Sequence, residues 1–88
     1  MAFPGTHLLE KGLKALKENK PEEACAYFGE IIEKNKESPE AWNGLLRALI
    51  AMGEIEGAQE AIADIPEKLL EHPEIKGAQA AIEIAAKK

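Results

Sequence analysis

Residues 38–66 read SPEAWNGLLRALIAMGEIEGAQEAIADIP, a stretch that predicts two helices joined by a tight turn. Ser38 is a preferred helix N-cap residue, and Pro39 is favoured at the first helical position. The apolar residues that follow recur at helical spacing as far as Gly53, a residue typical of a helix end: Trp42, Leu45, Leu46, Leu49 and Ile50. A second helix is predicted over about 55–65, and Pro66 ends it.

Helical patterns also lie on both sides of this stretch. A helix is predicted over about 6–18 with Thr6 as its N-cap, and another runs from Pro21 to about Asn35. A fifth helix begins at Pro73, and residues 66–72 between it and the fourth predict a short helical turn. Because no stretch alternates like a strand and the linkers are short, the sequence predicts an all-α fold of five helices in antiparallel hairpins.

The sequence aligns with itself when each position n is compared with position n + 34, a shift that we call the repeat period. In the nineteen positions from 22 to 40, eight residues are identical to the residue one period later, including Ala24 with Ala58 and Pro39 with Pro73. Similar residues also align, such as Leu16 with Ile50 and Phe28 with Ile62. A helix-turn-helix unit repeated at a fixed period indicates a solenoid of stacked hairpins.

The length of this period and its apolar and small residues resemble the tetratricopeptide repeat (TPR) family. The positions that match the family pattern are Trp42, Leu45, Gly53, Ala58 and Ile62 in one unit, and Leu8, Gly12, Ala24 and Phe28 in the unit before it. The resemblance covers nearly the whole chain and implies an antiparallel helix-turn-helix solenoid of about two and a half repeats. We expect one TPR-like domain over residues 1–88, with repeats at about 5–38 and 39–72 and a capping helix over 73–88.

The last unit departs from the pattern. Lys76, Gln79 and Glu83 stand at positions that are apolar in the first two units, and the apolar residues form a different stripe: Ile75, Ala78, Ile82 and Ala85. This shift predicts a last helix that is rotated relative to a normal first helix. A half-repeat with a polar outer face suits a solenoid cap. Leu69 and Leu70 of the spacer are expected to lie under the last helix pair.

Composition restricts the classes of partner. The net charge of −5 argues against nucleic acid and against an anionic membrane surface, both of which attract basic proteins. No apolar run approaches a membrane span, and the first residues do not resemble a signal peptide. The lone Cys25 cannot form an internal disulfide, which suits a buried thiol in a reducing compartment. We therefore expect a soluble, cytoplasmic protein.

Residues that could support catalysis or hold a metal show no convergent pattern. His7 and His72 are far apart and outside any metal-ligand spacing, and Ser38 is better explained as an N-cap than as a nucleophile. No glycine-rich loop for a phosphate is present. We expect no enzymatic activity, no cofactor and no metal.

The TPR resemblance implies that first helices line a concave, partner-binding face. On this register the candidate partner-binding residues are Leu9, Leu13, Lys17, Asn43, Arg47, Ile50 and Ala81, with Gly77 and Ile84 beside Ala81. The Lys and Asn positions with which some subfamilies hold a terminal carboxylate contain other residues here: Leu9, Leu13, Gly44, Glu74 and Ala78. The face fits a peptide with apolar anchors, although a second copy, another domain or the protein itself could equally cover Leu9 and Leu13.

A narrower resemblance links residues 40–66 and 77–87 to the C-terminal TPR tail of bacterial thioredoxin-fold co-chaperones. It implies chaperone-associated work, but the thioredoxin domain and its active-site motif are not in this sequence. Three functions stay open at this point: a module that binds a peptide or protein partner, a homo-oligomerisation domain, and a co-chaperone tail that holds client proteins.

Overall fold

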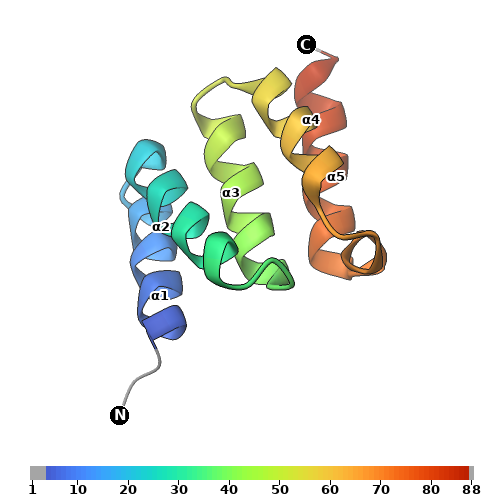
Figure 1. Cartoon of the computed structure of the whole chain (residues 1–88). Coiled ribbons are helices and arrows are strands. Elements are labelled where there is room, and N and C mark those ends of the chain that lie inside the picture. The colour runs from blue at the N-terminus through green and yellow to red at the C-terminus, as the bar shows by residue number, and fades with distance from the viewer. Residues whose placement is uncertain (1–3, 88) are drawn as a thin grey trace.

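The computed structural model describes residues 4–87, and the surroundings of side chains from His7 onward. These residues form five α-helices and one 3-10 helix and no strand (Figure 1). The elements are α1 (Pro4–Lys17), α2 (Pro21–Lys34), α3 (Pro39–Ala51), α4 (Ile55–Asp64), η1 (Glu67–Glu71) and α5 (Pro73–Ala86). The predicted all-α fold, its five helices and the short turn over the spacer are confirmed.

Two of the helix starts have a side-chain N-cap, those of α3 and α5, whereas α2 and α4 start without one. The Ser38 Oγ accepts a hydrogen bond from the Ala41 N–H at 3.4 Å, and His72 Nδ1 accepts one from the Glu74 N–H at 3.2 Å. Both residues are therefore N-caps, each followed by a proline at the first helical position. The prediction for Thr6 is wrong: α1 begins at Pro4, so Thr6 lies inside its first turn.

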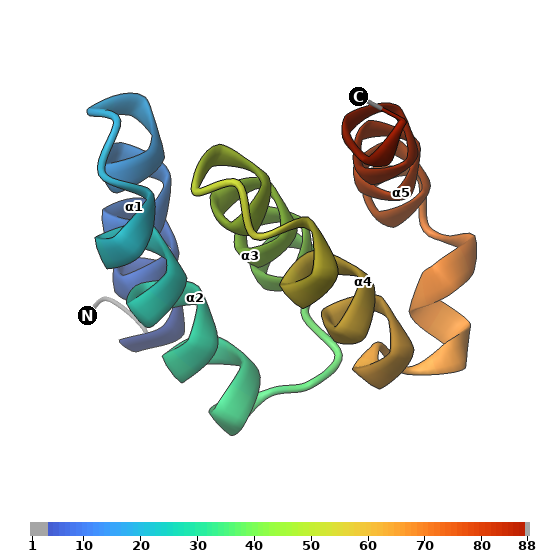
Figure 2. The same cartoon turned by 90° about the horizontal axis from the view of Figure 1, so that it is seen from above.

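The helices form two layers. Viewed from above, α1, α3 and α5 form one row, whereas α2 and α4 form the other (Figure 2). Helix α3 lies at the centre and contacts all four other α-helices. The turns inside the two hairpins share one backbone feature, because Asn19 (φ 62°) and Gly53 (φ 79°) are both left-handed and lie one repeat period apart. Glycine and asparagine tolerate this conformation best, and it ends α1 and α3 at equivalent points.

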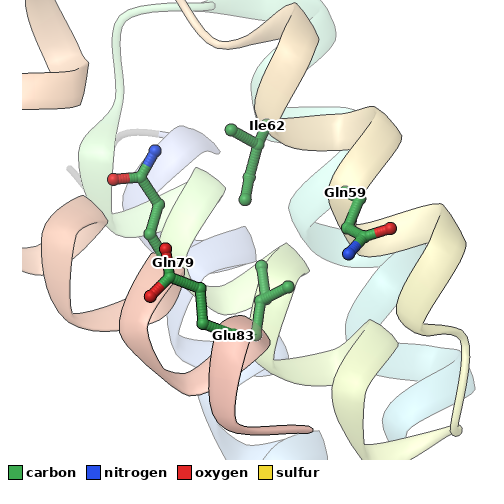
Figure 3. Close-up of a pocket in the computed structure, with 5 residues that line it drawn as sticks. Gln59, Ile62, Gln79 and Glu83 are labelled. Carbon is green, nitrogen blue, oxygen red and sulfur yellow. The ribbon is translucent and has the colours of Figure 1, made fainter. Parts of the chain in front are cut away.

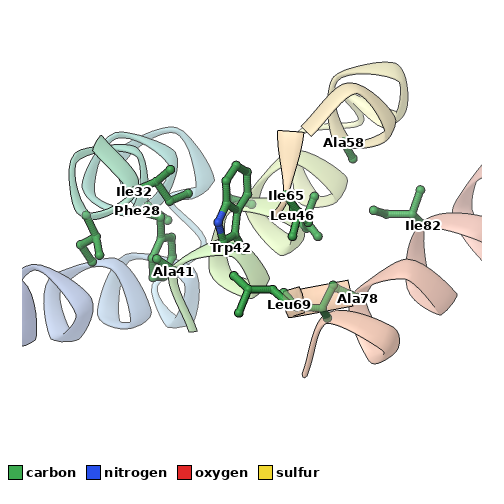
Figure 4. Close-up of a cluster of buried hydrophobic side chains, with 14 of the residues drawn as sticks. Phe28, Ile32, Ala41, Trp42, Leu46, Ala58, Ile65, Leu69, Ala78 and Ile82 are labelled. Atoms are coloured by element: carbon green, nitrogen blue, oxygen red, sulfur yellow. The ribbon is translucent and has the colours of Figure 1, made fainter. Parts of the chain in front are cut away.

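The largest completely buried side chain is that of Phe28 (Figure 4). It projects from α2 between two glycines, one on each neighbouring helix. A Cβ atom would lie 2.7 Å from the ring at Gly12 of α1 and 2.3 Å from it at Gly44 of α3. Both distances are far below van der Waals contact, so the three helices approach as closely as they do only because both positions lack a side chain.

Trp42 and Leu46 extend this core toward the C-terminal half (Figure 4). Trp42 is 4% exposed, and its Nε1–H donates a hydrogen bond to the Lys36 carbonyl at 2.8 Å, which ties α3 to the preceding loop. Leu46 is completely buried. Leu69 of η1 is buried in the same cluster, and Leu70 packs half-buried against it, which matches the expectation for the spacer.

The expected stripe on α5 is present, but the expected rotation of α5 is wrong. Ile75, Ala78 and Ile82 are buried and Ala85 is half-buried. Their counterparts one period earlier, Ala41, Gly44 and Ala48, are buried in α3 as well, so both helices turn the same face toward the preceding hairpin. The polar side chains of α5 instead occupy the positions of Trp42, Leu45 and Leu49, which in α3 pack within the core cluster or against it.

Adding one methyl group at Gly44 tests the contact with Phe28. We expect Gly44→Ala to lower the free energy of unfolding by about 1–3 kcal/mol, because the buried ring cannot move away without straining its neighbours. Gly29→Ala is the matched control: a Cβ there meets nothing within 4 Å, so removing a helical glycine should raise stability by about 0.5–1 kcal/mol. Urea denaturation followed by circular dichroism measures both, and equal effects of the two substitutions would contradict the contact.

Candidate functional site

Each helix of the α1–α3–α5 row exposes a residue at the same position of the repeat. Leu13, Arg47 and Ala81 lie one repeat period apart on these three helices, and all three are exposed. We call the surface around them the inner face. Leu13 is 51% exposed, and Ile84 on α5 is 65% exposed; these two are the exposed large hydrophobic residues among those described. Isolated exposed apolar side chains are common, but a pair at two ends of one face favours a contact surface.

The other candidate residues lie around these three with differing exposure. Leu9, Asn43 and Ile50 are half-buried, whereas Lys17 is exposed. In the repeat register Leu9 and Asn43 correspond, as do Leu16, Ile50 and Ile84. Lys17 corresponds to Ala51, so it lies one position away from the row of Ile50. Leu9, Leu16 and Ile50 also pack against the core, and this second role limits how far they can serve a ligand.

Arg47 is the chain's one arginine and the cation at the centre of the inner face. Its Nε–H donates a hydrogen bond to Asn43 Oδ1 at 3.2 Å, one turn earlier on α3. Neither of the ion pairs between described side chains, Lys20 with Glu18 and Lys68 with Glu37, involves Arg47. The amide therefore orients the guanidinium while leaving its terminal nitrogens for an anionic group.

A second concave feature lies between α4 and α5 and was missed by sequence reasoning. It is a cavity of about 360 Å³ lined by Gln59, Ile62, Gln79, Ile82 and Glu83. Figure 3 shows Gln59 and Ile62 on α4 across the cavity from Gln79 and Glu83 on α5. The signal that could have found it is the repeat register, because Gln79 and Glu83 replace Leu45 and Leu49.

Side chains of the kinds that bind metal ions do not cluster in residues 4–87. No group of three or more His, Cys, Asp or Glu side chains among them is placed to hold a metal ion. Cys25 is half-buried in α2, and this partial burial raises the pKa of its thiol, which disfavours the reactive thiolate. None of the described helices has the length and apolar character needed to cross a bilayer.

The two rows of antiparallel helices and the shared register define a helical repeat protein. A family model described as Tetratricopeptide repeat matches residues 15–82, and the chain therefore belongs to the tetratricopeptide repeat family. Searches of curated proteins and of solved structures gave no match. The family supports a protein-interaction module of the helical repeat type, and the resemblance to co-chaperone tails rests on the sequence alone.

Exposed apolar residues of the inner face should contribute little to folding. We expect Leu13→Glu and Ile84→Glu each to change the free energy of unfolding by no more than about 0.5 kcal/mol, because both side chains are largely in solvent. Leu46→Ala, at a completely buried position, should cost about 2–5 kcal/mol and serves as the reference. If urea denaturation shows a large loss for Leu13→Glu, Leu13 is a folding residue and not an available contact.

The raised thiol pKa of Cys25 makes its reactivity and the stability depend on pH. Alkylation by iodoacetamide at neutral pH, followed by mass spectrometry, should be slower in the folded chain than in the urea-unfolded chain. Because the folded state holds the proton more tightly, the stabilisation is complete below the unfolded pKa and is lost as pH rises through the folded pKa. Cys25→Ser should lack this alkaline loss; equal alkylation rates for folded and unfolded chain would contradict the assignment.

Proposed function

We propose that this chain is a non-enzymatic module that binds a peptide segment of a partner protein on the inner face. The observation that carries the proposal is the exposure of Leu13, Arg47 and Ala81 at one register of three adjacent helices. Across the three helices, such a row offers a ligand an apolar side chain on α1, a cation on α3 and a small residue on α5. Protein binding is also the function that the tetratricopeptide family suggests.

The side chains of the inner face favour a particular ligand chemistry. Leu13 and Ile84 supply apolar contacts near the two ends of the face, and the Asn43-oriented guanidinium of Arg47 lies in the central row. A complementary segment has apolar side chains flanking one Asp or Glu, because a carboxylate can accept two hydrogen bonds from a guanidinium. We propose that this segment belongs to a protein, since the net charge of −5 disfavours nucleic acid and anionic membranes.

Homo-oligomerisation is the second candidate, because the exposed Leu13 and Ile84 could equally be covered by another copy. Sedimentation at high micromolar concentration separates the two: a strict monomer removes self-association, and a dimer dissolved by Leu13→Glu supports it. A client-holding role, as in the co-chaperone tails that the sequence resembles, predicts suppression of a model client's aggregation without ATP. We propose a cytoplasmic site of action for any of the three.

The test begins with peptides selected from a displayed library against the purified chain. Binding of a selected peptide is then measured by fluorescence anisotropy with Leu13→Glu, Arg47→Glu and Lys34→Glu. We expect the first two variants to weaken binding by about tenfold or more, because truncating or reversing a central contact typically costs over about 1.4 kcal/mol. Lys34→Glu is the matched charge reversal on α2, in the other layer, and should change binding by less than about twofold.

The outcome also assigns the role of charge. If added salt weakens binding to the native chain but not to Arg47→Ala, the peptide's carboxylate contacts Arg47. If neither Leu13→Glu nor Arg47→Glu alters binding while the folded state is unchanged, the inner face is not the binding surface.

A further inference from the structure

The cavity between α4 and α5 lies where the next helix of the solenoid would pack. In the preceding hairpin, Leu49 of α3 faces α4: its Cδ2 lies 3.7 Å from a Cβ built on Gly57. The residue one period after Leu49 is Glu83, and the residue one period after Leu45 is Gln79. Both line the cavity, so α5 presents to it the same face that α3 presents to α4.

The floor and the rim of this cavity differ in chemistry. Ile82 is 2% exposed and Ile62 is half-buried, so the floor is apolar. The rim consists of Gln59, Gln79 and Glu83, where the preceding junction has Cys25, Leu45 and Leu49 (Figure 3). A helix seated here would meet amides and one carboxylate at its edges, whereas α4 meets Leu49 on α3.

We propose that this cavity is a second docking site and that it receives an amphipathic α-helix of a partner protein, with a lysine or arginine placed against Glu83. The shape follows from the register, because α4 occupies the corresponding place beside α3. The charge follows from the surroundings. Residues 54–88 contain eight Asp and Glu residues against four lysines, a net charge of −4 out of −5 for the whole chain, so this end of the molecule holds most of the excess negative charge.

A second copy of this chain is a poor occupant. Each of the five described α-helices already packs apolar residues into or against the core, so a copy could seat that apolar face in the cavity only by unfolding part of itself. The acidic residues of the two copies would also repel each other at the site. The site is distinct from the inner face, because none of Leu13, Arg47 and Ala81 lines the cavity.

The probe is a synthetic peptide built on residues 54–65. It keeps the apolar residues of α4 and replaces the exposed Glu56 and Glu60 with lysine. It also has lysine in place of Gly57: in the chain Gly57 faces Leu49, and in the cavity the residue that corresponds to Leu49 is Glu83. We expect saturable binding in anisotropy, with amide NMR shifts at Gln59, Ile62, Gln79, Ile82 and Glu83. Glu83→Lys should weaken binding at least about tenfold, because it turns the attractive contact into a repulsive one.

A charge swap provides the matched control. A second peptide has glutamate instead of lysine at the Gly57 position and is otherwise identical. It should bind the native chain more weakly than the probe does, and it should bind the Glu83→Lys variant more tightly than it binds the native chain. Leu13→Glu should leave probe binding unchanged, so failure at the inner face and failure at this cavity give different results. Binding unaffected by Glu83→Lys, or shifts confined to the inner face, would overturn the proposal.

A version of the probe that is tethered to the chain detects binding even when the free peptide binds weakly. The same helix is fused after Lys88 through a flexible Gly-Ser linker, which raises its effective concentration to the millimolar range. We expect a higher urea midpoint than for the unfused chain, and no increase when the fused chain also has Glu83→Lys. No increase in the native background would overturn the proposal, as would a concentration-dependent dimer of the unfused chain that Glu83→Lys abolishes.

Discussion

The fold depends on the contact between the Phe28 ring and two glycines. Because a Cβ at Gly12 or Gly44 would overlap the ring, these residues fix how closely α1, α2 and α3 approach. This spacing places α1 beside α3 in one row and thereby brings Leu13 and Arg47 onto one surface. A packing constraint between the first hairpin and α3 therefore determines the geometry of a surface on the outside of the molecule.

At the next junction, where α3, α4 and α5 meet, side chains of other sizes stand at the positions of Phe28 and the two glycines. Ile62 replaces Phe28 in the repeat register, Leu46 replaces Gly12 and Ala78 replaces Gly44. The completely buried Leu46 takes up volume that the phenylalanine ring occupies in the first junction, and Ile62 stays half-buried beside the cavity. The α4–α5 junction is consequently open on one side, and the opening is a product of residue volumes and of polar residues at the rim.

Sequence reasoning predicted the elements well because they depend on local chemistry. Ser38, Pro39 and Gly53 mark helix ends whatever the tertiary fold, and the apolar stripe of α5 follows from spacing alone. The rotation of α5 was predicted wrongly. The polar residues at 76, 79 and 83 correspond to apolar residues of α3, but the face that α3 and α5 share is the one that meets the preceding hairpin, and these residues do not belong to it. The role of Gly44 and the cavity were missed because both depend on side chains from different helices.

The two ends of the solenoid differ from its interior in the residues that they expose. At the α1 end, His7, Glu10 and Lys14 occupy the register of Ala41, Gly44 and Ala48, and all three are exposed. At the α5 end, the polar residues Gln59, Gln79 and Glu83 line the rim of the cavity. Among the side chains that the structure describes, neither end has the apolar face that stacks one repeat on another, which disfavours end-to-end association of copies through these residues. The apolar side chains that remain accessible are those of the inner face and those of the cavity floor, and none of the residues that define the inner face lines the cavity.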